Sequence, residues 1–404
     1  GGDGARASRA SDPGASFGEG ARLMKDMGDG YVAATVPDQQ PHWQDRLGAW
    51  LARPKVQAWA ARTPLIRNIV RREGDAMMDV VSGFVHAQVL SALVQLDLFE
   101  RLKDGPLPVD YLAREAGMSV ERMSILLRAV ASLKLLRKVG ADRYGLSFRG
   151  AALAGVPGLQ AMIRHHDVFY QDMADPLALL RGEVDTGLAG FWPYVFGAGA
   201  VDDPEQARTY SDLMADSQGL VADDTLDTVS LKGVRHLMDV GGGTGAFLSR
   251  ALQRYPDLRG TILDLPDVVF EARAKLEAAG LRSRVSIQPD SFRDADLPKG
   301  ADAISLVRVL YDHADHTVAD LLAKCFAALP SGGRLIVSEP MASHGTPERA
   351  GDCYFAFYCM AMQTGKARCQ AQVAEALRAA GFTKITSPKS RRPFVTSVVT
   401  AQKP

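Results

Sequence analysis

A glycine-rich turn, set between an apolar run and a helical pattern, constrains this chain more than any other segment. The apolar run His236–Val240 carries Asp239 near its end, and glycine follows at positions 241, 242, 243 and 245. The pattern from Ala246 to Gln253 is helical. Glycine lets a backbone turn sharply and approach a ligand closely, and the turn leads that ligand to a helix N-terminus. The segment therefore predicts a nucleotide-type site, and the alternative is a tight strand-to-helix turn without a ligand.

The spacing of these glycines narrows the class of ligand. A dinucleotide fingerprint has the form G-x-G-x-x-G, whereas this chain has G-x-G-x-G at 241, 243 and 245. That form, with Asp239 just before it, resembles the first motif of S-adenosylmethionine-dependent methyltransferases. Roughly twenty residues further on, Thr261–Pro266 reads as a second strand ending in Asp264, where an acid is placed to accept hydrogen bonds from ribose hydroxyls.

Further strand patterns alternate with helical patterns in the same half of the chain. The stretch Val285–Ile287 leads into Asp290, Ser291 and Phe292, which puts a carboxylate and an aromatic face where an adenine would lie. Alternation of this kind predicts a parallel, doubly wound α/β sheet of the Rossmann-like class, with its ligand at the carboxyl ends of the strands. The remaining patterns are strands at 302–307, 334–338, 383–386 and 395–401, and helices at 266–279, 316–329 and 370–380.

The region 75–150 has the pattern of an α-helical winged-helix domain. Ser119 is expected to cap a helix from Val120 to Leu133, and a small hairpin follows over 135–146. A winged helix usually indicates DNA binding, but this helix carries apolar side chains where base-reading groups would be needed. The 47 basic and 47 acidic residues also balance, so no nucleic-acid partner is predicted. Dimerisation is the predicted role, with a DNA-binding regulator that senses a cofactor as the alternative. The apolar side chains are Met123, Ile125, Leu126, Leu127, Val130 and Leu133.

The N-terminal segments differ from the rest in composition. Residues 1–42 are rich in Gly, Ala, Ser and Asp and are predicted to be disordered. Residues 43–74 mix Trp43, Trp50 and Trp59 with seven Arg and Lys side chains, which suits an element at a membrane surface. An ordinary pair of docking helices is the alternative. Four cysteines without C-x-x-C spacing predict neither a metal site nor disulfides, and no span or signal peptide is visible. The expected location is cytoplasmic, with peripheral membrane contact as the further expectation.

These features together resemble the plant-type small-molecule O-methyltransferase family. The resemblance implies a winged-helix dimerisation domain at 75–150, a helical linker with the substrate-binding region at 151–231, and a class I methyltransferase domain at 232–404. Within the family, the chain is most similar to the bacterial demethylspheroidene (hydroxyneurosporene) branch, which implies a homodimer that methylates a carotenoid hydroxyl. A phenolic or polyketide hydroxyl is the alternative substrate. The segments that carry the closer match are Phe84–Leu90, Leu96–Phe99, Val307–Asp315, Leu329–Leu335, Ser338–Pro340 and Tyr354–Met362.

By the same resemblance the cofactor is S-adenosylmethionine. The turn and the strand ends would hold different parts of it. The assignments are Asp239, Gly241 and Gly243 for the methionine end and the turn, Asp264 for the ribose, and Asp290, Ser291 and Phe292 for the adenine. Arg308 stands where plant relatives have an aromatic residue that flanks the cofactor.

The catalytic position departs from the family pattern. Plant-type members carry a histidine base in a His-Asp-Trp-Ser-Asp segment, and here the corresponding residues begin with Tyr311, Asp312 and His313. A tyrosine with a pKa near 10 is a poor base at neutral pH. Three interpretations stay open. His313 takes the proton from a shifted position; Tyr311 only orients the hydroxyl while proximity to the sulfonium does most of the work; or His165 or His166 reaches in from the linker.

Two further positions concern the catalytic mechanism. Glu339 matches an acid near the base in relatives, although it could equally be a strand-end ion-pair partner, and a second family acid is replaced by Ala367. The ten residues Cys353–Met362 carry no charge, which fits a wall for a long hydrocarbon ligand or else core and dimer packing. The linker adds the aromatic residues Phe169, Tyr170, Phe191, Trp192, Tyr194 and Phe196.

Overall fold

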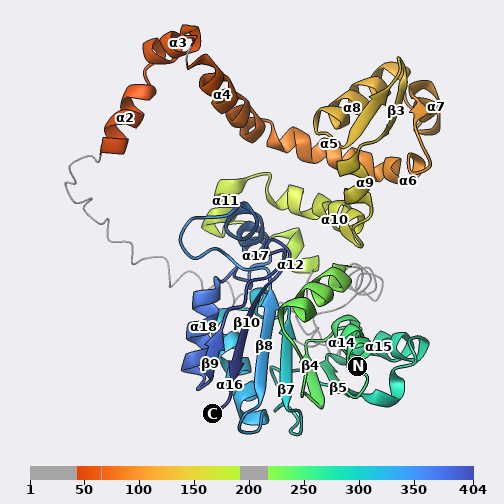
Figure 1. Ribbon diagram of the computed structural model, residues 1–404, viewed down its shortest axis with the longest axis vertical. Helices are drawn as coiled ribbons and strands as arrows, with labels where there is room; N and C mark the ends of the chain where they lie inside the picture. The colour runs from red at the N-terminus through yellow and green to blue at the C-terminus, as the bar shows by residue number, and fades with distance from the viewer. Residues whose placement is uncertain (1–42, 65, 192–216) are drawn as a thin grey trace, which may run out of the picture. The chain divides into compact units, whose positions relative to one another are not determined.

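The computed structural model describes residues 43–64, 66–191 and 217–404 (Figure 1). Its contacts divide the chain into two compact units, Gly1–Ser82 and Gly83–Pro404. The expected disorder of residues 1–42 lies outside the described residues, as do Trp192, Tyr194, Phe196 and the side chain of Phe191.

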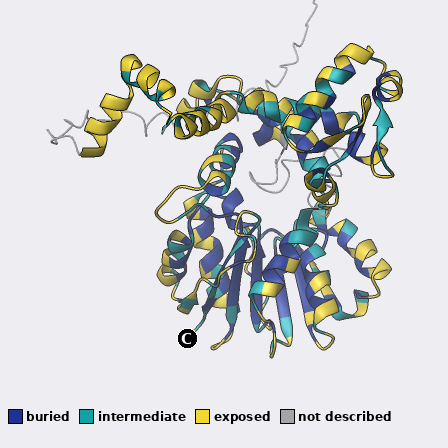
Figure 2. Cartoon of the chain, turned by 45° about the horizontal axis from the view of Figure 1, so that its top comes forward, coloured by how far each residue is buried: buried dark blue, intermediate teal, exposed yellow. Residues whose placement is uncertain are grey.

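The described part of the first unit consists of α2 (Trp43–Leu51), α3 (Pro54–Arg62) and α4 (Arg67–Val81). None of the residues of these three helices is buried, and Figure 2 colours them mostly as exposed. Trp43, Leu47 and Trp50 are spaced to share one face of α2. In the described chain no single helix is long and apolar enough to cross a membrane, and only the broken pair Arg67–Val81 and Gly83–Gln95 passes that test together.

The second unit begins with a small domain whose core contains the expected winged helix. Three strands pair in the order β1-β3-β2, and Ser119 caps α8 by accepting the N–H of Arg122 at 3.2 Å. Met123, Leu127 and Val130 lie in the core of this domain. Dimerisation was predicted from the apolar side chains of this helix, but these three are buried in their own domain and are not part of an exposed surface. The elements are α5 (Gly83–Gln95), α6 (Leu98–Arg101), β1 (Leu107–Pro108), α7 (Val109–Glu115), α8 (Val120–Ser132), β2 (Leu136–Val139) and β3 (Arg143–Leu146).

A helical region connects this domain to the sheet. Its helix α10 (Leu159–Asp172) packs against the segment 354–362 through Phe169, whose ring centroid lies 5.4 Å from that of Tyr358. The region is thus fixed to residues almost two hundred positions later in the chain. Its other elements are α9 (Phe148–Ala154), α11 (Pro176–Arg181), α12 (Gly187–Phe191) and a helix over 217–228.

A seven-stranded sheet of order β6-β5-β4-β7-β8-β10-β9 forms the C-terminal domain. Helices α14 and α15 cover one face and α16 and α18 the other (Figure 1). Successive side chains of β4 alternate between the two cores, since Leu237 packs on the α14 side and Met238 on the α16 side. The elements are β4 (His236–Val240), α14 (Ala246–Arg254), β5 (Arg259–Asp264), α15 (Pro266–Ala278), η2 (Arg282–Arg284), β6 (Val285–Pro289), β7 (Ala303–Val307), η3 (Leu310–Asp312), α16 (Asp315–Ala328), β8 (Arg334–Glu339), η4 (Arg349–Phe355), α17 (Ala356–Ala361), α18 (Gln370–Ala379), β9 (Thr383–Thr386) and β10 (Ser397–Gln402).

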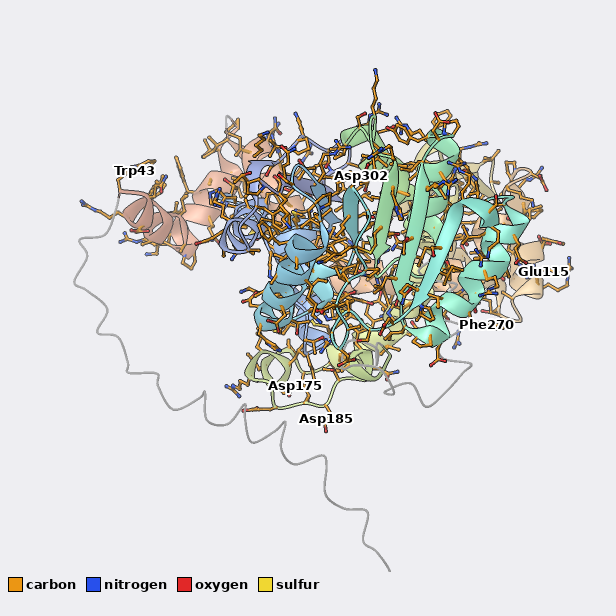
Figure 3. All side chains as sticks on the ribbon, turned by 90° about the horizontal axis from the view of Figure 1, so that it is seen from below. Trp43, Glu115, Asp175, Asp185, Phe270 and Asp302 are labelled. Carbon is orange, nitrogen blue, oxygen red and sulfur yellow. The ribbon has the colours of Figure 1, made fainter. Side chains whose placement is uncertain are left out.

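The predicted two-part α/β architecture is confirmed, with one correction to the sheet. β10 runs antiparallel to both β8 and β9, so the sheet is mixed and not wholly parallel. No helix lies in the connection 387–396, and strands joined without a crossover pair antiparallel. At the amino end of the sheet, Asp302 (labelled in Figure 3) accepts the N–H of His236 at 2.8 Å. The residues predicted to hold the cofactor lie at the opposite end.

Candidate active site

The glycine turn after β4 is closely packed at Gly241 and open at Gly243. Gly241 and Gly243 have φ angles of 68° and 57°, in the left-handed region that favours glycine. A Cβ on Gly241 would lie 2.8 Å from Cγ2 of Val309, whereas a Cβ on Gly243 would meet no described atom within 4 Å. The turn can therefore hold a ligand against its own backbone at Gly243.

Two carboxylates flank this turn, and for both of them the cost of removing the charged group from water raises the pKa. Asp239 is buried; its Oδ1 accepts the Ser305 hydroxyl at 2.6 Å, and its Oδ2 has no hydrogen-bond partner among the described residues. Burial raises the pKa of Asp239 to about 7. Asp264 accepts the N–H of Gly243 at 2.7 Å and that of Leu265 at 2.8 Å, and desolvation raises its pKa to about 6. Carboxylates in this state favour a ligand that brings a cation or hydroxyl donors.

The next strand end places an aromatic face beside Asp264. The N–H of Asp290 donates to the carbonyl of Asp264 at 2.9 Å, and the Asp290 carboxylate accepts the N–H of Ser291 at the same distance. The Phe292 ring follows and meets His313 edge to face, with centroids 5.3 Å apart. The structure thus brings the residues predicted for ribose and adenine to one rim.

His313 lies on this rim, beside Phe292. Its side chain is buried, and its Nδ1 accepts a hydrogen bond of 3.1 Å from the Arg293 guanidinium. Burial, with the charges of Arg293 and Arg368, lowers the pKa of His313 to about 3. Among the three interpretations of the base, these contacts count against His313, because its Nδ1 already accepts a hydrogen bond from an arginine and its pKa is low.

Tyr311 lies beside an unusual residue, Arg308. Arg308 has a φ of 58°, a conformation that is rare outside glycine and that often marks functional sites. Its guanidinium donates to Tyr311 Oη at 3.3 Å and to Ser217 Oγ at 2.9 Å. Burial raises the pKa of Tyr311 well above its usual value, so the phenol is protonated at neutral pH. Tyr311 can therefore orient a hydroxyl more readily than it can deprotonate one.

Buried acids lie beneath Tyr311. Glu339 Oε2 accepts the backbone N–H of Tyr311 at 3.1 Å, and Oε1 has no partner among the described residues. Burial raises the pKa of Glu339 to about 8, although the nearby Arg368 opposes the shift. Asp312 is buried close enough to raise the Glu339 pKa further. Glu339 thus anchors the backbone of the loop that carries Tyr311.

The linker histidines each meet a tyrosine from the segment 354–362. His165 Nε2 lies 2.8 Å from Tyr358 Oη, and His166 Nε2 lies 2.7 Å from Tyr354 Oη. Arg308 is close enough to Tyr354 to act on the pKa of its phenol. His166, Tyr354, Arg308 and Tyr311 therefore form one polar group between the linker and the end of β7.

Two residues of this site were not among the sequence candidates. Arg368 is buried and donates to the carbonyls of Leu310 at 2.8 Å and His313 at 2.9 Å, which fixes the loop after β7. Tyr354 lies in the uncharged run Cys353–Met362, which was interpreted as a wall for a hydrocarbon ligand or else as core and dimer packing, and not as part of the reaction centre. The sequence signal that could have indicated these contacts was the four-residue spacing of Tyr354 and Tyr358, together with the adjacent histidines His165 and His166.

Comparison with known proteins decides the family. The O-methyltransferase domain model matches residues 170–383, and the O-methyltransferase dimerisation domain model matches residues 78–154. The chain belongs to the O-methyltransferase family. The predicted activity and the cofactor S-adenosylmethionine are thereby confirmed, and the dimerisation domain indicates a homodimer. The unpartnered Asp239 Oδ2 and the open backbone at Gly243 fit this cofactor.

Individual relatives within the O-methyltransferase family are similar over most of their length. The demethylspheroidene O-methyltransferase of Cereibacter sphaeroides is 51% identical over 89% of this chain and 95% of its own. The enzyme of the same name from Rhodobacter capsulatus is 49% identical over 85% of each chain. The crystal structure of human N-acetylserotonin methyltransferase in complex with SAM has a TM-score of 0.69, covering 82% of this chain and 97% of that one at 23% identity. That structure supports the fold.

Proposed function

We propose that this O-methyltransferase acts on the hydroxyl of a hydroxylated carotenoid, of the demethylspheroidene or 1-hydroxyneurosporene type. The observation that carries the proposal is the 51% identity to a demethylspheroidene O-methyltransferase across 95% of that enzyme. A chain this similar over its full catalytic length is expected to keep the same acceptor chemistry.

The substrate side agrees with a hydrocarbon ligand. Phe169 and Leu188 from the linker pack with Tyr358 and Met362 in one apolar cluster, and Phe357 and Met360 adjoin it half-buried. Methionine adapts to irregular apolar shapes, and pockets for hydrocarbon ligands are lined by such groups. We assign the linker 151–231 and the run Cys353–Met362 to substrate binding, the region 75–150 to dimerisation and 232–404 to the cofactor.

For the cofactor, we assign each acid at the rim to one group. Asp239 would pair with the methionine ammonium, which supplies the charge that its buried Oδ2 lacks. Asp264 would accept the ribose hydroxyls, while Gly241 and Gly243 form the turn. The adenine would lie by three residues of the next strand end, Asp290, Ser291 and Phe292.

The proton must leave during the transfer, because an aliphatic alcohol is too weak an acid to ionise first. When bound, S-adenosylmethionine supplies an electrophilic methyl group. We propose that the linker histidine His166 receives the proton, since His313 faces Arg293 and Tyr311 is held protonated. Tyr311 and Arg308 would orient the substrate oxygen, with Asp312 and Glu339 supporting their loop.

A radiolabelled methyl-transfer assay tests the acceptor. Purified enzyme should methylate a 1-hydroxycarotenoid in mixed micelles and leave simple phenols unmethylated. Turnover of phenolic acceptors with none of the hydroxycarotenoid would instead assign the enzyme to a phenolic or polyketide substrate.

We further propose that α2 and α3 contact a membrane surface, where a carotenoid would be found. Trp43, Trp50 and Trp59 are exposed on these helices. The segment 43–72 has seven basic side chains and one acid, Asp45, which complements anionic lipid. Neither family model extends over residues 43–74, so no domain of the family accounts for this surface.

A further inference from the structure

Two histidine–tyrosine pairs join α10 to the segment 354–362. The adjacent residues His165 and His166 contact Tyr358 and Tyr354, with N···O distances of 2.8 and 2.7 Å. Tyr354 and Tyr358 are four residues apart, so both phenols face α10. The pairs look alike in sequence, but their surroundings differ.

The pair His165–Tyr358 belongs to the core. Both side chains are buried, and Tyr358 lies in the apolar cluster with Phe169 and Met362. Desolvation lowers the pKa of His165 to about 4, which keeps its ring neutral. This pair has the properties of a structural clamp between the linker and α17.

The pair His166–Tyr354 belongs to the polar group at the end of β7, with Arg308 and Tyr311. Tyr354 is within the field of Arg308, which lowers the phenol pKa against the larger effect of burial. The same guanidinium holds Tyr311 Oη at 3.3 Å. Tyr354 thus stands between the histidine of the linker and the residues that flank the candidate reaction centre.

A π-helix presents Tyr354. The segment Arg349–Phe355 (η4) is wound as a π-helix, a conformation that is rare and frequent at functional sites. Within it, Gly351 lets the segment pack closely on the chain after β8, because a Cβ there would lie 2.2 Å from the carbonyl oxygen of Met341. The local winding, and not the helix α17 that follows, therefore sets the direction of the Tyr354 phenol.

We propose that Tyr354 is a catalytic residue that relays the proton of the substrate hydroxyl to His166. This inference rests on the proposed acceptor being an alcohol. The substrate oxygen bonds to the methyl carbon while the carbon–sulfur bond breaks, and sulfur keeps that electron pair. The hydroxyl proton passes to Tyr354 Oη as the Tyr354 proton passes to His166 Nε2. The products are the methyl ether, S-adenosylhomocysteine and a His166 imidazolium, so atoms and charge balance.

The groups around His166 set the pH at which the relay works. Burial lowers the His166 pKa and the neighbouring Asp167 raises it, the former being the larger effect. His165 is adjacent on α10, Tyr170 is one turn on with its ring centroid 6.1 Å away, and Tyr354 faces the ring from η4. Because the His166 pKa is lowered from its usual value, the ring is neutral at pH 7, and the rate should fall on the acid side as the ring takes up a proton.

The matched variants are Tyr354→Phe and Tyr358→Phe, with His166→Gln as the partner change. In full-length enzyme, Tyr354→Phe and His166→Gln should each lower kcat by about 10²–10⁴, the usual contribution of general-base catalysis. In both variants kcat should also no longer fall as the pH is lowered, so the acid limb of the plot of kcat against pH is lost. Tyr358→Phe should lower thermal stability and keep that limb.

A second readout needs no turnover. In ¹⁵N NMR of the protein without cofactor, Tyr354→Phe should shift the His166 Nε2 resonance and its titration midpoint, and Tyr358→Phe should shift those of His165 instead. The relay is overturned if Tyr354→Phe keeps the acid limb, whether or not His166→Gln loses it. Failure of wild type to methylate any hydroxycarotenoid would sink the proposed substrate, and the NMR titration would still report on the pair.

Discussion

Two carboxylates at the rim of the sheet, Asp239 and Asp264, are already removed from water before any ligand binds. Asp239 and Asp264 have pKa values raised to about 7 and about 6, and each must be ionised to bind a cation or hydroxyl donor well. Ligand binding then offsets the free-energy penalty of desolvation, so cofactor affinity and protonation are linked.

Asp264→Ala should weaken binding of S-adenosylhomocysteine by roughly 10- to 100-fold, the size expected for hydrogen bonds to a charged group. Titration calorimetry measures this directly. Asp257→Ala, an exposed acid just before the amino end of β5, serves as the control and should bind as wild type does. Unchanged affinity in Asp264→Ala would remove the ribose assignment.

The raised pKa values predict a pH dependence of cofactor binding. As pH falls from 7.5 to 5, Asp239 protonates around 7 and Asp264 around 6, so affinity for S-adenosylhomocysteine should fall by up to about tenfold per pH unit for each carboxylate that takes up a proton. Asp264→Asn should make that slope shallower. An affinity independent of pH over this range would contradict the assignment of either carboxylate.

His313→Gln tests whether the shifted histidine is the base. Because its ring packs on Phe292 and accepts from Arg293, we expect kcat within about twofold of wild type and a lower free energy of unfolding, by about 1–2 kcal/mol. The folded pKa of about 3 lies below the unfolded 6.5, so protonation in the unfolded state destabilises the native enzyme as pH falls below 6.5. The stability deficit of the variant should therefore be smaller at pH 5 than at 7.5 in urea titrations. Loss of kcat at full cofactor affinity would return His313 to the catalytic candidates.

At the scale of elements, α2 and α3 carry the exposed tryptophans Trp43, Trp50 and Trp59, and none of the described residues in either helix is buried. A helix with exposed tryptophan and basic side chains gains free energy at an anionic bilayer from both apolar burial and charge. Its attraction per basic side chain is about 1 kcal/mol near such a surface and is screened by salt.

Replacing Trp43, Trp50 and Trp59 together with Ser should reduce co-sedimentation with anionic phosphatidylglycerol vesicles. Binding of the wild type should also weaken at high salt. Phe270→Ser removes another exposed aromatic (labelled in Figure 3) and should leave vesicle binding unchanged. If deletion of residues 1–73 leaves vesicle binding equal to wild type, the helices have another role, such as docking on protein.

At the scale of the whole molecule, assembly depends on the region that matches the dimerisation domain. Ile125 and Phe148 are exposed there in the single chain, and Phe84, on α5, is 74% exposed. Exposed apolar side chains gathered in one domain are typical of an interface.

Phe84→Asp should shift the enzyme from dimer towards monomer in light scattering at micromolar concentration, because a charge in an apolar interface is strongly unfavourable. Phe270→Asp, outside the dimerisation match, should remain dimeric. A Phe84→Asp protein that stays dimeric would place the interface elsewhere in the chain.

Much of the fold and the cofactor half of the site could be predicted from local patterns. The glycine spacing after Asp239, the acid after β5 and the alternation of strand and helix are short-range signals, and they locate strand ends reliably. Residues at the carboxyl ends of parallel strands must meet at one edge of the sheet. The order of the strands and helices therefore predicted which residues lie together at the rim.

Only the tertiary structure decided the direction of β10, the packing of Met123 into its own domain and the partners of the histidines. His166 and Tyr354 are 188 residues apart, and the left-handed turn at Arg308 is unfavourable for the residue itself. Local preferences do not predict such features, because their free energy comes from burial and from long-range contacts that exist only once the chain has folded. The sequence by itself therefore determined which strand ends carry the residues proposed for the methyl donor, and only the fold decided which side chains lie near the proposed acceptor site.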